Sequence, residues 1–179
     1  KKLIYLKITL IIYLMVVNQF LIHDYLTSNT FDTKDILKTN LYKLGIVLKD
    51  YPEQNMMILY NKFNSENRKK LESECRSIIV NRTTYDVINY TCPTPIYNFD
   101  AMRYLVQNQD KSKEIYECYE GSLMSVFNFE GKWYISSRRF LNVDKNEQFD
   151  MFLDVLTLEN YTFETFTSFL NTLVFLRFL

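Results

Sequence analysis

Short apolar runs of strand length fill the middle of this 179-residue sequence, and they constrain its fold more than any other feature. The runs are NMMILYNKF (55–63), CRSIIVN (75–81) and TTYDVINYT (83–91). They combine apolar, aromatic and β-branched residues, which is typical of β-strands, and the short turn between the second and third runs predicts a hairpin. The segment 115–137 divides into two more strands at the turn NFEGK (128–132).

Helical spacing flanks these strands on both sides. FDTKDILKTNLYKLGIVLKDY (31–51) predicts one helix that ends before Pro52. PTPIYNFDAMRYLVQNQ (93–109) predicts a proline-bounded loop that leads into a short helix, and the tail 147–175 predicts two helices. The order is helix, four or more strands, then helices. We therefore predict an α+β fold with an antiparallel sheet at its centre and flanking helices.

Residues 1–30 are predicted to be an apolar N-terminal extension to a domain at 31–179. The run Ile8–Val17 has Thr9 as its only clearly polar residue, and it is short for the roughly 20 residues of a membrane span. The wider window 3–22 reaches spanning length only by including a lysine, an asparagine and a glutamine. Three alternatives are open: a buried or partner-packing element, a signal or membrane anchor, and non-native sequence.

The charge balance excludes a strong overall electrostatic field. Lys plus Arg and Asp plus Glu each number 21, so any attraction to nucleic acid or to an anionic membrane has to come from a local patch. With 14 Tyr and 14 Phe but only 3 Gly and 3 Pro, the chain is predicted to be compact and ordered. The cysteines Cys75, Cys92 and Cys118 are odd in number and widely spaced, so we expect reduced thiols and no metal site.

Four blocks of the sequence carry a resemblance to a known family. They are ECRSIIV (74–80), CPTPIYN (92–98), CYEGSLMSVF (118–127) and KWYISSRR (132–139). In this order and spacing they resemble the phage-type RNA ligases, which belong to the covalent nucleotidyltransferase superfamily. The resemblance covers roughly residues 32–153. It implies the front part of a nucleotidyltransferase domain that is incomplete at its C-terminus, because the glutamate and lysine motifs expected downstream find no counterpart.

The resemblance also implies a missing nucleophile. In this family a lysine opens the pattern lysine, any residue, Asp or Glu, Gly, and it attacks the α-phosphate of ATP to hold AMP as a phosphoramidate. The matching residues here are Cys118, Tyr119, Glu120 and Gly121, so the attacking amine is absent. We therefore expect the ligase reaction to fail at its first step. The plainer interpretation of Cys118 is an inert residue, since no histidine lies nearby in sequence to activate it.

Three further positions are carried over as nucleotide-binding residues. Glu74 and Arg76 match a Glu-Cys-Arg-Gly block whose arginine lies near the nucleotide, although Ser77 replaces the glycine. Tyr97 stands at an aromatic position of the family. The structural alternative for Glu74 and Arg76 is that they lie two apart on a strand, point to the same face and pair with each other.

The last block adds positive charge to the predicted pocket. Arg138 stands where the family has a lysine that faces phosphate, and Arg139 follows it. Glu120 and Gly121 match the family directly and complete the predicted nucleotide-binding set. The alternatives are a solvated basic edge for the two arginines and a structural turn for Glu120 and Gly121. The neighbouring aromatic residues are predicted to lie in the sheet core: Phe127, Phe129, Trp133 and Tyr134.

These expectations lead to a catalytically impaired RNA-ligase-like protein with a structural or interaction role in a viral particle or larger assembly. Its partners are then other proteins of that assembly, its location is the virion or host cytoplasm, and it needs no cofactor. The alternative is an ATP-dependent RNA ligase, or a nucleotide- or RNA-binding module with a partial pocket, which would use ATP and magnesium. A third alternative is a domain tethered to a membrane through residues 3–22.

Overall fold

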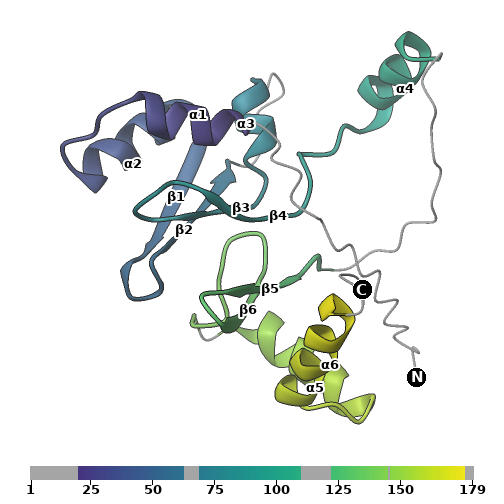
Figure 1. Cartoon of the computed structure of the whole chain (residues 1–179). Coiled ribbons are helices and arrows are strands. Elements are labelled where there is room, and N and C mark those ends of the chain that lie inside the picture. Colours follow the sequence, from purple (N-terminus) through teal and green to yellow (C-terminus); the bar gives the residue numbers. More distant parts are fainter. Residues whose placement is uncertain (1–19, 63–68, 110–121, 145, 176–179) are drawn as a thin grey trace.

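Four layers stack on one another in the computed structural model, which describes residues 20–62, 69–109, 122–144 and 146–175. Three helices cover a four-stranded sheet, a two-stranded sheet packs on the opposite face, and two more helices cover that hairpin (Figure 1). The first layer consists of α1 (Leu21–Ser28), α2 (Lys34–Lys43) and α3 (Lys70–Glu74). The last layer consists of α5 (Glu147–Leu158) and α6 (Phe163–Phe175).

Sheet A is an antiparallel meander in which the strands follow one another in sequence order. Its strands are β1 (Ile46–Tyr51), β2 (Met56–Asn61), β3 (Ile78–Asn81) and β4 (Val87–Tyr90). A 3-10 turn, η1 (Pro52–Gln54), joins β1 to β2, so that Tyr51 pairs with Met56. Ile58 pairs with Ile79, and a register shift between Ile79 and Val80 marks the pairing of β3 with β4. The hairpin predicted for β3 and β4 is confirmed.

The two faces of sheet A serve two different cores because side chains alternate along each strand. Met57 and Leu59 face the helices, where they pack with Leu37 and Leu41 of α2. The alternate residues of β2 and β3 pack against the second sheet. This second core contains Met56, Ile58 and Ile79 of sheet A with Phe127 and Tyr134 of the hairpin.

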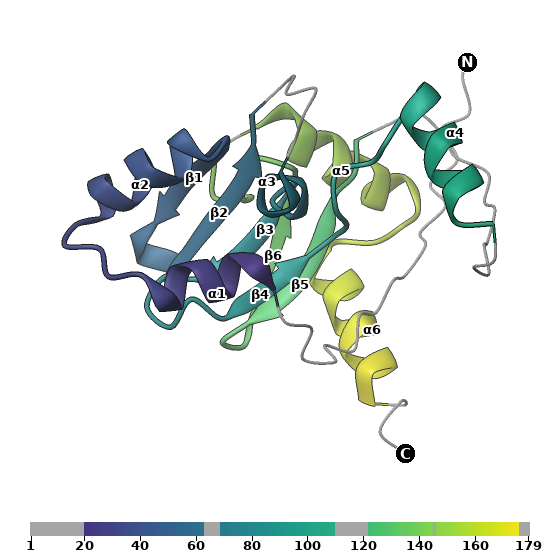
Figure 2. The ribbon, with the colours of Figure 1, turned by 90° about the horizontal axis from the view of Figure 1, so that it is seen from above.

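Sheet B is the hairpin of β5 (Ser125–Phe129) and β6 (Lys132–Ser136). Its turn residues Glu130 and Gly131 both have positive φ, 51° and 77°, which is the turn geometry that matches the twist of paired strands. Seen from above, the hairpin lies under sheet A with α5 and α6 beyond it (Figure 2). The predicted turn and two C-terminal helices are confirmed. Phe127 and Tyr134 are buried as predicted, and Phe129 and Trp133 pack against the cores.

One predicted helix is wrong in its second half. The helix expected over 31–51 ends at Lys43, and residues 46–51 form β1 instead. Gly45 has φ of +82°, which ends the helix in a conformation that L side chains rarely adopt. The alternating residues that follow then find six pairing partners on β2. Leu48 fits a helical spacing and a strand spacing equally well, and pairing decided between them.

Helix α1 shares its core with the rest of the domain. Ile22 and Leu26 are fully buried and belong to the same cluster as Leu37 and Leu41, although sequence patterns assigned them to the N-terminal extension. The run Ile8–Val17 and most of the window 3–22 lie outside the described residues. Within the described part, none of the helices combines the length and the apolar character that crossing a bilayer requires.

Helix α4 (Asn98–Gln107) stands away from the four layers (Figures 1 and 2). It follows the proline-bounded loop as predicted, and none of its residues is buried. Phe99 is 82% exposed and Val106 is 64% exposed. A ten-residue helix has little stability in water without tertiary packing. It is therefore unusual that α4 exposes its apolar side chains instead of packing them against the four layers.

Candidate functional site

An open pocket of about 370 Å³ lies at one end of the two sheets. Arg76 and Ser77 come just before β3, and Thr91 comes just after β4. In an antiparallel pair, the start of one strand and the end of the next lie at the same end of the sheet, so these residues are close together there. The same geometry in sheet B adds Ser122 before β5 and Arg138 after β6. The pocket is therefore built from the strand ends of both sheets.

Arg138 crosses from sheet B to sheet A. Its Nη2 donates to the backbone oxygen of Asn61 at 3.2 Å and also to the Oδ1 of the same residue. Arg139 also lines the pocket and lies with its guanidinium 5.6 Å from the centre of the Tyr60 ring. A guanidinium over an aromatic face is a favourable cation–π contact. Both arginines are half-buried, so neither is a freely solvated side chain of a basic edge.

Arg76 reaches the pocket from the opposite sheet. It is half-buried, and its Nη1 lies 3.1 Å from the Sγ of Cys92. The pocket lining among the described residues thus has three arginines and lacks acidic side chains. Three arginines in a described lining without acidic side chains favour an anionic ligand, and guanidinium groups suit phosphate because they donate paired hydrogen bonds.

Two hydroxyl groups in this pocket lack a hydrogen-bond partner among the described residues. They are the Oγ of Ser136, a residue only 1% exposed, and the Oγ1 of Thr91. Buried polar groups are nearly always hydrogen-bonded in proteins, and an unpaired one costs free energy. The two unpaired oxygens are therefore candidate contacts for a polar ligand.

Glu74 has a structural role and not the predicted role in nucleotide binding. It is the last residue of α3, and its carboxylate accepts hydrogen bonds from the backbone nitrogens of Leu21 at 3.0 Å and Ile22 at 2.9 Å. It therefore caps the first turn of α1, and it is not among the residues that line the pocket. The placement of Glu74 and Arg76 on one strand is wrong, because β3 begins only at Ile78 and the two side chains contact different partners.

The remaining predicted positions divide between the surface and the undescribed part of the chain. Tyr97 is 65% exposed at the start of α4 and does not line the pocket. Cys118, Glu120 and Gly121 lie outside the described residues, so their predicted roles stay predictions. Ser122, the next residue in the sequence, lines the pocket.

Asn61 is the residue that sequence patterns missed. It is fully buried and holds Arg138, whereas its sequence context indicates only a strand. The pattern did contain an indication, because Asn61 shares a strand face with the core residues Met57 and Leu59. A polar residue on an otherwise apolar face calls for a specific partner.

The thiols of the described cysteines are free, and they differ in setting. Burial, and next the charges of Glu74 and Glu72, raise the pKa of Cys75 far above its usual range, so this thiol stays protonated and unreactive. Cys92 is half-buried beside Arg76. Within the described part of the chain, no group of His, Cys, Asp and Glu side chains is arranged to hold a metal ion.

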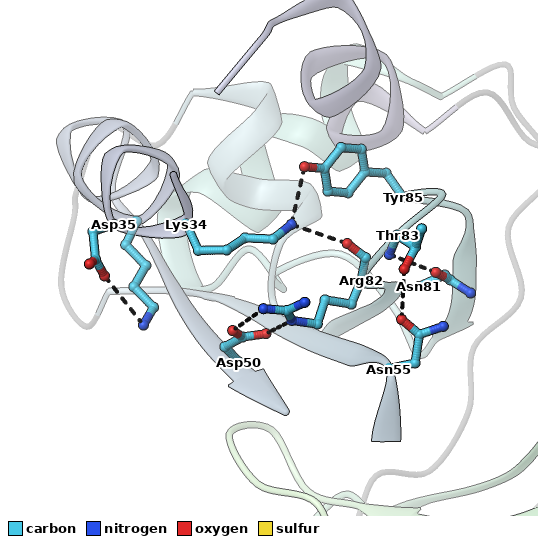
Figure 3. A network of polar contacts seen from close by, with 9 residues as sticks. Lys34, Asp35, Asp50, Asn55, Asn81, Arg82, Thr83 and Tyr85 are labelled. Carbon is cyan, nitrogen blue, oxygen red and sulfur yellow. Dashed lines mark hydrogen bonds and ion pairs between the residues drawn. The ribbon is translucent and has the colours of Figure 1, made fainter. Parts of the chain in front are cut away.

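A second polar cluster lies away from the pocket, where the turn between β3 and β4 meets α2 (Figure 3). Arg82 pairs with Asp50 through Nε at 2.8 Å, and Lys34 donates to the backbone oxygen of Arg82 and the hydroxyl of Tyr85. The Oδ1 of Asn81 accepts hydrogen bonds from the backbone nitrogens of Thr83 and Thr84, and these bonds shape the turn. The polar groups of this cluster form hydrogen bonds and an ion pair with one another. The cluster therefore stabilises the turn, and we do not assign a binding site to it.

Comparison with known proteins gives one similar protein with a described activity. The chain is 29% identical over 106 residues to a protein of Autographa californica nuclear polyhedrosis virus whose name describes it as a bifunctional polynucleotide kinase/RNA ligase. The match covers 54% of this chain but only 15% of that protein. This chain is therefore similar to part of a viral protein named as a polynucleotide kinase/RNA ligase. No family model and no solved structure matches it.

Proposed function

We propose that this protein is a catalytically impaired, RNA-ligase-like module that binds a nucleotide phosphate in the pocket at the strand ends of the two sheets. One observation carries the proposal. Arg76 and Arg138, which come from separate sequence blocks and were both predicted to contact the nucleotide, line the same pocket. The similar viral protein is named as an RNA ligase, which agrees with a ligand of this class.

The proposed binding energy comes from the arginines and the hydroxyl groups. Arg76, Arg138 and Arg139 supply positive charge, and charge-assisted hydrogen bonds to phosphate are about twice as strong as neutral ones. The unpartnered hydroxyls of Ser136 and Thr91 are proposed to add polar contacts. A volume of about 370 Å³ lies in the range of small-molecule sites. Magnesium would enter with ATP, because the described residues contain no metal cluster of their own.

The proposed impairment rests on Cys118. A thiol at this position cannot form the phosphoramidate that a lysine amine forms with AMP, so transfer stops before its first covalent step. Arginine side chains hold phosphate but stay protonated, so they do not replace that nucleophile. The expected behaviour is nucleotide binding without covalent adenylylation.

The test combines binding with labelling. ATP with magnesium is titrated into the protein by calorimetry, and protein incubated with α-labelled ATP is denatured and scored for retained label. We expect binding without label for the natural chain and label for Cys118→Lys. Binding should weaken about tenfold or more in Arg76→Met and Arg138→Met, because each loses one charged contact.

Arg103→Met is the matched control for these variants. Arg103 is an exposed arginine on α4, where it pairs with Asp100 at 3.5 Å, and it does not line the pocket. Its removal should leave ATP affinity unchanged. The proposal fails if the natural chain binds no ATP, or if the Arg103 variant weakens binding as much as the pocket variants do. Label on the natural chain would overturn the impairment.

A second candidate function is favoured by α4. We propose that its exposed apolar face docks on another protein of a viral assembly, with the chain in a structural role. Phe99, Met102 and Val106 follow helical spacing and are each more than half exposed. Association of this kind predicts a larger hydrodynamic size for the chain mixed with virion proteins, which Phe99→Ser with Val106→Ser should abolish. If the double variant still associates, α4 is not the contact.

A further inference from the structure

Asn61 is a fully buried polar side chain at the end of β2. It stands on the face of the strand that also carries Met57 and Leu59, both with no exposed surface. An amide placed in such a layer costs free energy unless hydrogen bonds satisfy both its donor and its acceptor.

Both ends of this amide have partners, and they come from three different parts of the chain. The Nδ2 group donates to the backbone oxygen of Glu72 at 3.3 Å and to the Oγ1 of Thr94. The Oδ1 atom accepts from the Nη2 of Arg138, which also donates to the backbone oxygen of Asn61 at 3.2 Å. Because arginine only donates, the oxygen of the amide must face Arg138 and the nitrogen must face the other two acceptors.

We infer that Asn61 is a positioning residue that fixes the guanidinium of Arg138 in the pocket before any ligand arrives. This inference rests on the proposed function for its effect on binding. An arginine side chain loses up to about 2 kcal/mol of conformational free energy when it is ordered. Two acceptors from one buried residue pay that cost in the free protein, so a phosphate group meets an arginine already in place.

A positioning residue and a purely structural residue lead to different results at this site. A structural asparagine would affect the stability of the domain, and both arginines after β6 would respond alike. A positioning residue changes the state of Arg138 but not that of its neighbour Arg139, which contacts the Tyr60 ring instead. Arg139 is therefore an internal reference in the same protein.

Asn61→Leu and Asn61→Asp separate the hydrogen bond from the volume. Leucine has the same branching as asparagine, with bulkier methyl groups, and it lacks both the acceptor and the donor, whereas aspartate keeps an acceptor for Arg138. The first readout is the rate at which phenylglyoxal modifies Arg138 and Arg139 without nucleotide, measured by peptide mass spectrometry. The second readout is the dissociation constant for ATP with magnesium.

In Asn61→Leu we expect Arg138 to react faster by about tenfold, with Arg139 unchanged, since loss of a hydrogen bond to a charged group is worth about one order of magnitude. In Asn61→Asp, Arg138 should stay protected, while ATP binds more weakly because the carboxylate offsets its charge. Arg138 exposed in the aspartate variant, or both arginines exposed equally in the leucine variant, would overturn the inference. The aspartate variant decides by itself if the leucine variant does not fold.

The two readouts also separate this inference from the proposed function. If the natural chain binds no ATP, the proposed function fails, and the modification rates still decide the role of Asn61. If the natural chain and Asn61→Leu bind ATP equally, the proposed function stands and the positioning role is refuted.

Discussion

The carboxylate of Glu74 caps helix α1 by accepting hydrogen bonds from the backbone nitrogens of Leu21 and Ile22, at 3.0 and 2.9 Å. The first amides of a helix have no partner within the helix, and a side-chain acceptor there stabilises it, with the helix dipole adding to the effect of a negative charge. A residue predicted to contact a ligand thus ties α1 to α3.

Glu74→Ala should lower the free energy of unfolding by about 1 kcal/mol, which is typical for loss of a helix cap. It should leave ATP affinity unchanged, because Glu74 does not line the pocket. Urea denaturation and calorimetry measure the two quantities. Glu53→Ala, at an exposed position of η1, is the control for removing a carboxylate and should change stability by less than about 0.5 kcal/mol. If ATP affinity falls in Glu74→Ala but not in Glu53→Ala, Glu74 contributes to the binding site after all.

Gly45→Ala should be more destabilising than Gly131→Ala. Both glycines have positive φ, 82° and 77°, so an alanine at either site costs roughly 1 kcal/mol in backbone conformation. At Gly45 an added Cβ would also lie 2.7 Å from the side-chain Cδ of Glu72, which is buried, whereas at Gly131 it would meet nothing within 4 Å. The expected difference, about 1 kcal/mol or more, is measured by chemical denaturation. Equal losses would mean that Glu72 moves aside without cost.

Ser136→Ala should separate stability from binding. The Oγ of Ser136 has no partner among the described residues, so its removal should leave the free protein as stable as before or slightly more stable. ATP affinity should fall about fivefold through loss of one hydrogen bond, if the ligand satisfies this group. Ser168→Ala, at an exposed site on α6, is the control and should alter neither quantity. Lower stability without nucleotide would show that Ser136 already has a partner in the free protein.

The buried hydroxyl group of Tyr51 should make the free energy of unfolding depend on pH. Burial, and next the hydrogen bond to Asp144, raise the pKa of Tyr51 well above its usual value. The folded state therefore keeps the proton when the unfolded state loses it, so this contribution to stability is complete below about pH 10 and declines as the pH rises further. The unfolding free energy of the natural chain should fall more steeply above about pH 10 than that of Tyr51→Phe. Identical slopes in urea denaturation at pH 9 to 11 would contradict this assignment.

Most of the secondary-structure elements follow from the pattern of residues along the chain. The periodicity of the apolar residues predicted β2, β3, β4, the hairpin of sheet B and the two C-terminal helices, because burial of one face repeats every two residues in a strand and about every 3.6 in a helix. The block order also placed Arg76 and Arg138 in one predicted pocket, and the structure brings both to its lining.

The features that depend on contacts between distant residues follow only from the packing of the layers. The segment 46–51 became a strand because β2 offered it a pairing partner, which local spacing does not reveal. Glu74 became a helix cap because α1 packs beside α3, and Asn61 became the anchor of Arg138 because the two sheets stack. Hydrogen bonds join atoms that are near in space, and nearness in space is set by how the layers pack, not by the order of residues along the chain.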